Sequence, residues 1–136
     1  MADKSDDLAR VPLFSGLGRR ELKQLAGRCK ERRVSAGTTP VQEGKMSGVG
    51  FFVVAEGEAV VSVGGKPVAM LKPGGHFGEV ALITEAERTA TVTATTELRL
   101  LEIPFYDFRD FAHANPDVMW KLLQHVVATQ YGDPRH

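Results

Sequence analysis

Residues 76–92, HFGEVALITEAERTATV, place an acid and an arginine nine residues apart around a short apolar run. We predict that residues 78–82 form a short helical turn. The first N–H groups of such a turn have no partner within it, and its dipole favours an anion there. Gly78 would let that anion approach the backbone, and Arg88 could hold a phosphate by two parallel hydrogen bonds. The two ends of the stretch could therefore close on one phosphate.

Glu79 needs a different explanation, because a carboxylate is a poor neighbour for a phosphate. It can accept hydrogen bonds from hydroxyl donors such as a ribose 2′-OH. One ligand that carries both a phosphate and a free ribose hydroxyl would explain Glu79 and Arg88 together. A structural salt bridge between Glu79 and Arg88 is the alternative, and residue chemistry alone leaves both open.

Composition limits the classes of protein that the chain can represent. Its 136 residues predict one domain with one core, and 17 basic residues balance 17 acidic ones. A neutral chain has no general attraction to nucleic acid or to an anionic membrane. The first ten residues have no apolar h-region, so we expect no signal peptide. No apolar run approaches the length of a membrane span, and we expect a cytoplasmic protein. Cys29 is the only cysteine, and its place in a helical pattern predicts a buried thiol.

The chain divides into a helical start, a β-rich middle and a helical end. A helix is predicted over residues 11–29, where Leu22, Leu25, Ala26 and Cys29 form one apolar stripe. Short apolar runs separated by glycines predict strands at 51–56, 58–63, 66–71, 89–94 and 97–103. Residues 64–65, Gly-Gly, predict a tight hairpin between the second and third of these. Regular short strands favour an antiparallel barrel or sandwich.

Two helices are predicted after Pro104. The first covers residues 105–112, and the second begins with Asn115 as N-cap and Pro116 as first helical residue. The second helix is expected to reach about Tyr131, with Gly132 and Pro134 beyond its end. Its apolar residues cover more than one face, so one face can pack on the barrel while another covers a ligand or pairs with another chain. These residues are Val118, Met119, Trp120, Leu122, Leu123, Val126, Val127 and Tyr131.

FGEVAL followed by RTATV resembles the phosphate-binding cassette of cyclic nucleotide-binding domains. The family includes the sensor domains of cAMP-dependent protein kinase regulatory subunits and of catabolite activator proteins. The resemblance covers nearly the whole chain. It implies a mainly β protein, an antiparallel β-roll or jelly-roll barrel flanked by helices. A single domain over 1–136 would consist of an N-terminal helical segment (1–30), the roll with its cassette (31–103, cassette 75–92) and C-terminal hinge and lid helices (104–131).

The resemblance also implies roles for individual residues. Gly78 and Glu79 match the positions that hold the ribose 2′-OH, Ala81 matches a backbone N–H donor to the phosphate, and Val80 lies between them. Arg88 matches the arginine paired with the cyclic phosphate. Thr89 matches the next position, where threonine often accompanies cGMP preference but also occurs in cAMP-preferring channels. The last helix of the family covers the base, which makes Trp120 and Leu123 lid candidates; core packing is the alternative role for both.

The implied function is a cAMP or cGMP sensor that signals by moving its C-terminal helices. It would need no cofactor besides the nucleotide and would act on a protein partner or an effector domain, with no nucleic acid and no membrane. The C-terminal helix is also a candidate surface for a homodimer. The alternative is a non-enzymatic interaction module of the same fold that binds no nucleotide or another effector.

An enzyme with a metal centre is the other class considered. A metal-binding barrel needs clustered histidines, whereas His76, His113, His125 and His136 are spread over the chain and no His-x-His occurs. We therefore expect neither a metal site nor catalysis.

Overall fold

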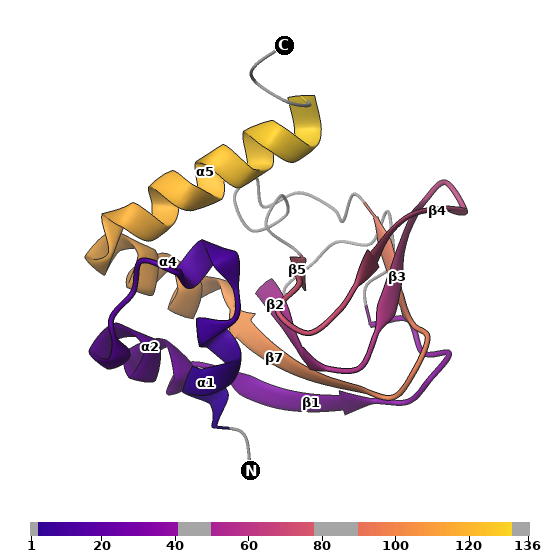
Figure 1. Cartoon of the computed structure of the whole chain (residues 1–136), viewed down its shortest axis with the longest axis horizontal. Helices are drawn as coiled ribbons and strands as arrows, with labels where there is room; N and C mark the ends of the chain where they lie inside the picture. The colour runs from indigo at the N-terminus through magenta and orange to yellow at the C-terminus, as the bar shows by residue number, and fades with distance from the viewer. Residues whose placement is uncertain (1–2, 41–49, 78–89, 132–136) are drawn as a thin grey trace.

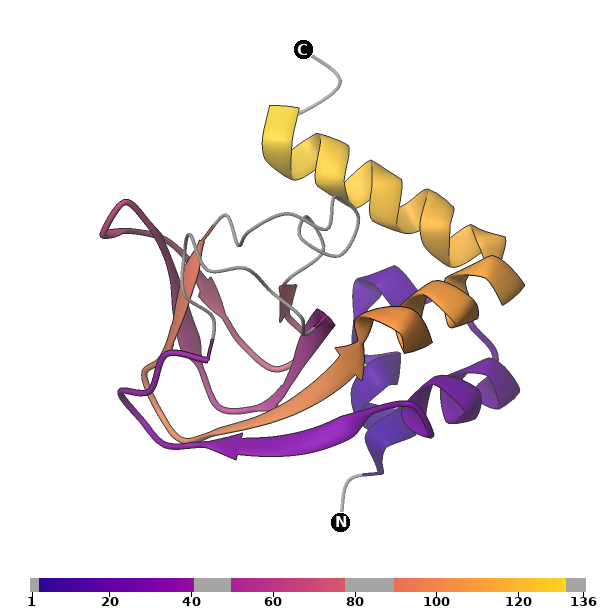
Figure 2. The same cartoon turned by 180° about the vertical axis from the view of Figure 1, so that it is seen from behind.

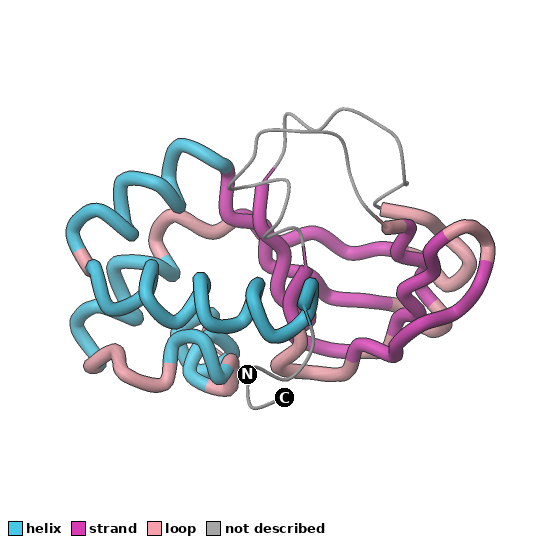
Figure 3. The backbone as a smooth tube through the Cα atoms, turned by 90° about the horizontal axis from the view of Figure 1, so that it is seen from above, coloured by secondary structure: helices cyan, strands magenta, loops and turns pink. Residues whose placement is uncertain are grey.

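The chain folds into a β-roll with a layer of helices against one side, in a computed structural model that describes residues 3–40, 50–77 and 90–131. Figures 1 and 3 show the N-terminal and C-terminal helices together on one side and the strands on the other. The strands form two antiparallel sheets, ordered β1-β7-β2-β5 and β4-β3-β6. This confirms the predicted fold class. Among the described residues, no helix is both long and apolar enough to cross a bilayer.

The strands confirm the predicted runs and add two that the pattern did not indicate. They are β1 (Lys30–Val34), β2 (Gly50–Glu56), β3 (Ala59–Val63), β4 (Lys66–Leu71), β5 (His76–Phe77), β6 (Thr91–Ala94) and β7 (Leu98–Pro104). The added strand β1 has a buried side chain only at Val34, so it lacks apolar alternation. It is a strand because it pairs with β7 along its whole length, as Figure 2 shows. The added β5 has two residues, too few for any period.

The two central strands of the four-stranded sheet, β2 and β7, are buried on both faces, which explains their continuous apolar runs. On β2, Phe51, Val53 and Ala55 face the helices, whereas Phe52 and Val54 face the interior of the roll. On β7, Leu101 and Ile103 face the helices, and Leu98 and Leu100 face the roll. The two cores therefore share their two central strands.

The N-terminal helical segment departs from the single helix predicted over residues 11–29. It consists of α1 (Lys4–Ala9), a 3-10 turn η1 (Pro12–Phe14) and α2 (Arg19–Ala26). The predicted apolar stripe is confirmed, because Leu25 and Cys29 are buried and Leu22 and Ala26 pack against the same core. The helix starts late because Gly18 is extended, with φ −79° and ψ 174°, and acts as its N-cap. The short α1 buries only Asp7 and Leu8 and has too few apolar residues for a periodic signal.

The predicted hairpin and the C-terminal helices are confirmed. Gly64 and Gly65 have φ of +60° and +81° and join β3 to β4 in a two-residue turn. The helix α4 (Phe105–Ala114) is followed by α5 (Pro116–Tyr131). Asn115 lies between them, and its side-chain amide donates to the carbonyl of Phe111, 3.0 Å away, at the end of α4. Gly132 and Pro134 lie outside the described residues.

Candidate functional site

The candidate ligand residues Gly78, Glu79, Val80, Ala81, Arg88 and Thr89 lie outside the described part of the chain. The described chain stops at Phe77, the end of β5, and resumes at Ala90, just before β6. The strand β5 pairs with β2 in one sheet, and β6 pairs with β3 in the other. The candidate segment therefore connects the two sheets of the roll. The contacts of the strands on either side of it, β5 and β6, fix where it begins and ends.

Aromatic stacking holds β5, where the candidate segment begins. Phe77 stacks on Phe52 with ring centroids 5.0 Å apart and lies in the core of the roll. His76 stacks on Phe51 at 5.1 Å, on the helical side of the sheet. Phe51 also stacks on Phe108 of α4, at 5.1 Å. The two residues of β5 are therefore anchored on opposite faces of the sheet.

The turn before β5 is fixed by backbone contacts. The Gly74 N–H donates to the carbonyl of Val54, and the Val54 N–H donates to the carbonyl of Gly75, both at 2.9 Å. Gly74 has φ of +94°, and a Cβ placed on it would lie 3.1 Å from the carbonyl oxygen of Arg10. The positive φ favours glycine here, and the close approach of Arg10 would crowd any side chain. Arg10 follows α1, so the N-terminal segment touches the chain just before the candidate segment.

The helix α5 faces the same region across a hollow. The hollow has a volume of about 440 Å³, and α5 contributes Lys121 and Gln124 to its wall. Among the described residues, the wall also includes Pro12, Leu13, Leu71, Gly74, Gly75 and His76. Lys121 Nζ donates to the Ser15 hydroxyl, 2.9 Å away, beside η1. The predicted lid helix therefore lies next to β5 and next to the N-terminal segment.

The lid candidates Trp120 and Leu123 are both exposed, at 62% and 50%. Their alternative role in core packing is wrong in this structure. Val118 makes that contact instead and is only 1% exposed. Residues 118 and 120 point about 200° apart around a helix, so burying Val118 turns Trp120 outward. A face of α5 with exposed apolar residues is thus available to a ligand or to another chain.

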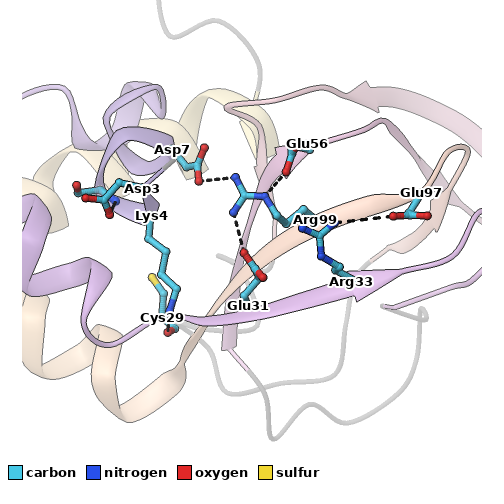
Figure 4. Close-up of polar contacts among 10 residues, drawn as sticks. Asp3, Lys4, Asp7, Cys29, Glu31, Arg33, Glu56, Glu97 and Arg99 are labelled. Atoms are coloured by element: carbon cyan, nitrogen blue, oxygen red, sulfur yellow. Dashed lines mark hydrogen bonds and ion pairs between the residues drawn. The ribbon is translucent and has the colours of Figure 1, made fainter. Parts of the chain in front are cut away.

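A buried guanidinium links the N-terminal helix to the roll, as Figure 4 shows. Arg99 of β7 is 5% exposed and contacts three carboxylates. Its Nη2 lies 2.6 Å from Asp7 Oδ2 of α1, its Nη1 lies 2.9 Å from Glu31 Oε1 of β1, and its Nε donates to Glu56 of β2. Burial opposes the charged form of Arg99, but the hydrogen bonds to these carboxylates outweigh it and raise the pKa of the guanidinium.

Strand register explains why these side chains meet. Side chains alternate along a strand, so Arg99 lies on the same face of β7 as Leu101 and Ile103, which is the helical side. A bulge between Val54 and Glu56 places Glu56 opposite Arg99 and therefore on that side. Glu31 lies two residues before Arg33, the other cross-strand partner of Arg99. Sequence reasoning missed this cluster, because Asp7 and Arg99 are 92 residues apart.

The histidines lie on different elements of the fold. His76 lies on β5, His113 on α4 and His125 on α5, while His136 is outside the described residues. Within residues 3–40, 50–77 and 90–131, no three His, Cys, Asp or Glu side chains are grouped so that they could hold a metal ion.

The family model of the cyclic nucleotide-binding domain matches residues 31–115. The chain therefore belongs to the cyclic nucleotide-binding domain family, as the cassette motif indicated. The match includes the whole candidate segment and ends at Asn115, the residue before α5.

Similar proteins come from several kinds of regulatory system. A cyclic nucleotide-gated potassium channel of Rhizobium etli is 34% identical over 94% of this chain and 36% of its own length. A cAMP-dependent protein kinase regulatory subunit of Yarrowia lipolytica is 43% identical over 68% of this chain and 25% of its own. The crystal structure of the Thermus thermophilus catabolite activator protein matches with a TM-score of 0.81 and 26% identity, over 88% of this chain and 58% of that one. The chain thus spans about a quarter of the length of the kinase regulatory subunit and about a third of the length of the channel.

Proposed function

We propose that this chain is a sensor module that binds cAMP or cGMP and signals by movement of its C-terminal helices, without catalysing a reaction. The observation that carries the proposal is the family match over residues 31–115, because it includes both Glu79 and Arg88. The names of the relatives support it, since one is a cyclic nucleotide-gated channel and another a cAMP-dependent regulatory subunit. Both relatives are longer than this chain, which fits a module that would act on an effector domain or on a partner protein.

Each proposed ligand residue has a chemical task. The Arg88 guanidinium would neutralise the cyclic phosphate through two parallel hydrogen bonds, and the backbone N–H of Ala81 would donate to the same anion. Glu79 would accept the ribose 2′-OH, with the backbone of Gly78 beside it. Val80 completes the turn, and Thr89 would reach the phosphate or the base.

The helix α5 would act as the lid. Its apolar residues Trp120 and Leu123 are exposed, which leaves them available to cover a base. Its polar tie to the N-terminal segment, from Lys121 to Ser15, is exposed to solvent and so adds little to stability. Ligand would favour the arrangement of α5 that completes the contacts with the base, which is a population shift.

Calorimetric titration of nucleotide-stripped protein with cAMP, cGMP and 5′-AMP tests the proposal. We expect micromolar or tighter binding of a cyclic nucleotide and none of 5′-AMP. The ratio of the cAMP and cGMP affinities shows whether the protein prefers cGMP, the preference that threonine at position 89 often accompanies in the family. Absence of binding to all three would reject the sensor and favour the interaction module, with Glu79 and Arg88 as a structural salt bridge.

The Arg88→Ala substitution tests the proposed phosphate contact. We expect cyclic nucleotide affinity to fall by about 2–5 kcal/mol, or roughly 30-fold to several thousandfold, because the phosphate loses its charged partner. Arg19→Ala is the matched control, since it removes the same charge from an exposed position on α2. Wild-type affinity in Arg88→Ala would reject the cassette assignment.

A further inference from the structure

The helix α1 packs mainly against α2, and Asp7 provides its buried ionic contact with the sheet. Within the described residues, Leu8 packs in the helical core, Lys4 Nζ donates to the Cys29 carbonyl at 3.1 Å, and Asp7 contacts Arg99. Asp7 and Arg99 are both almost fully buried, at 2% and 5% exposure. Because a buried charge is unstable without its partner, this pair holds the end of α1 to the sheet.

The end of α1 in turn supports the turn before β5. The Arg10 N–H donates to the carbonyl of Asp7, at 3.2 Å, so Arg10 is held at the end of the helix that carries Asp7. The carbonyl of Arg10 lies close to Gly74, so that a Cβ on Gly74 would be only 3.1 Å from its oxygen. Pro12 and Leu13, which follow, form part of the same wall as Gly74, Gly75 and His76. A continuous set of contacts thus leads from Arg99 to the start of the cassette.

We propose that Arg99 is a positioning residue for the cassette. Through Asp7 it fixes the end of α1, and Arg10 then braces the turn at residues 72–75 from which the chain enters β5 and the cassette. The consequence for nucleotide affinity rests on the proposed function, whereas the bracing does not. The competing explanation is that the stacks of His76 on Phe51 and of Phe77 on Phe52 hold β5 without help from α1.

Amide hydrogen exchange measured by NMR tests the bracing directly. The amides of Val54, Gly74 and Gly75 are the reporters, because their hydrogen bonds define the turn. Asp7→Asn and Arg99→Met are expected to raise exchange at these amides about tenfold. Exchange in the β3–β4 hairpin, which none of these contacts reaches, is expected to be unchanged. Arg99→Lys should recover part of the protection, since it keeps the charge but not the three-way geometry.

Arg33→Met is the matched control. Arg33 is the cross-strand partner of Arg99 and also pairs with a carboxylate, Glu97, at 3.8 Å. Both members of that pair are exposed, and neither contacts α1. This variant should exchange like the wild type at Val54, Gly74 and Gly75. Asp7→Asn keeps Glu31 and Glu56 on Arg99, so it carries the test if Arg99→Met does not fold.

The affinity measurement is made below the melting temperature of each variant, where a purely structural loss of stability leaves binding unchanged. Asp7→Asn and Arg99→Met are expected to bind the preferred cyclic nucleotide about fivefold more weakly or worse, and Arg33→Met normally. The proposal is overturned if exchange rises at the amides of Arg10 and Val11 while Val54, Gly74 and Gly75 keep wild-type protection. It is also overturned if affinity is unchanged. A wild-type protein that binds no cyclic nucleotide rejects the proposed function instead, and the exchange experiment still decides the bracing.

Discussion

Gly57 and Gly37 have nearly the same backbone conformation but different surroundings. Their φ angles are +91° and +88°, a backbone conformation that residues other than glycine rarely adopt. A Cβ on Gly57 would lie 2.2 Å from the Glu97 carbonyl oxygen, whereas one on Gly37 would meet nothing within 4 Å. We expect Gly37→Ala to lower the free energy of unfolding by about 1 kcal/mol, and Gly57→Ala by about 3 kcal/mol or more. Urea unfolding measures both, and equal losses would show that the contact with Glu97 relaxes freely.

Cys29 should be chemically inert in the folded protein. Burial raises the pKa of its thiol to about 12, the nearby Lys4 opposes this, and Asp107 adds to it. The thiol is only 6% exposed, and its Sγ lies 3.3 Å from the Leu25 carbonyl. We expect iodoacetamide to modify Cys29 only after unfolding. Rapid modification of the native protein at pH 8 would contradict the burial.

The same thiol makes stability depend on pH in the alkaline range. The unfolded chain releases the thiol proton near the ordinary pKa of 9.0, whereas the folded protein retains it up to about 12. The contribution of Cys29 to the free energy of unfolding is therefore constant below 9.0 and falls as the pH rises from there towards 12. Comparison with Cys29→Ala isolates this effect from the lysines and tyrosines that titrate in the same range.

At the scale of elements, α5 presents two faces with different roles. Val118 is buried against the helical core, and Trp120 and Leu123 are exposed. We expect Val118→Ala to lower the free energy of unfolding by about 1–3 kcal/mol. Trp120→Ala and Leu123→Ala should change it by less than about 0.5 kcal/mol. Thermal unfolding of the three variants without nucleotide provides the comparison, and a large loss for Trp120→Ala would mean that this face is covered in solution.

Trp120 also reports on lid movement, because it is the only tryptophan of the chain. If α5 covers the base, nucleotide binding moves Trp120 from water into an apolar contact. We expect its emission to shift to the blue on addition of the preferred cyclic nucleotide and to stay unchanged with 5′-AMP. An emission that is already blue in ligand-free protein, with a dimer in sedimentation equilibrium, would assign this face to pairing of two copies.

At the scale of the whole molecule, the two cores should unfold together, because both are built on β2 and β7. Leu100 faces the roll and the adjacent Leu101 faces the helices. We expect Leu100→Ala and Leu101→Ala each to cost about 2–5 kcal/mol and to leave one cooperative transition with an unchanged urea dependence. Circular dichroism and pulse modification of Cys29 follow the unfolding of backbone and helical core. Two separate midpoints would show that the cores are independent.

Local signals in the sequence predicted a large part of this protein. Glycines 64 and 65 define the hairpin because their positive φ angles suit a two-residue turn. Residues 115–116, Asn-Pro, mark the start of α5, because proline is favoured at the first helical position. The runs at 51–56 and 97–103 form strands, because an apolar stretch of that length is typical of a buried strand. The cassette motif at residues 76–92 led to the family that the comparisons show. The ligand residues within it remain predictions from sequence.

Long-range contacts decided the rest. The charged run of β1 became a strand only through pairing with β7, and α1 is joined to the sheet by Asp7, which meets Arg99 from 92 residues away. The assignment of Phe51 to the helical core and of Phe52 to the roll likewise required both layers to be present. Turn chemistry and periodicity act between residues that are close in the chain, so the sequence shows them directly. Burial and ion pairing depend on which distant surfaces meet, and only the tertiary structure brings those surfaces together.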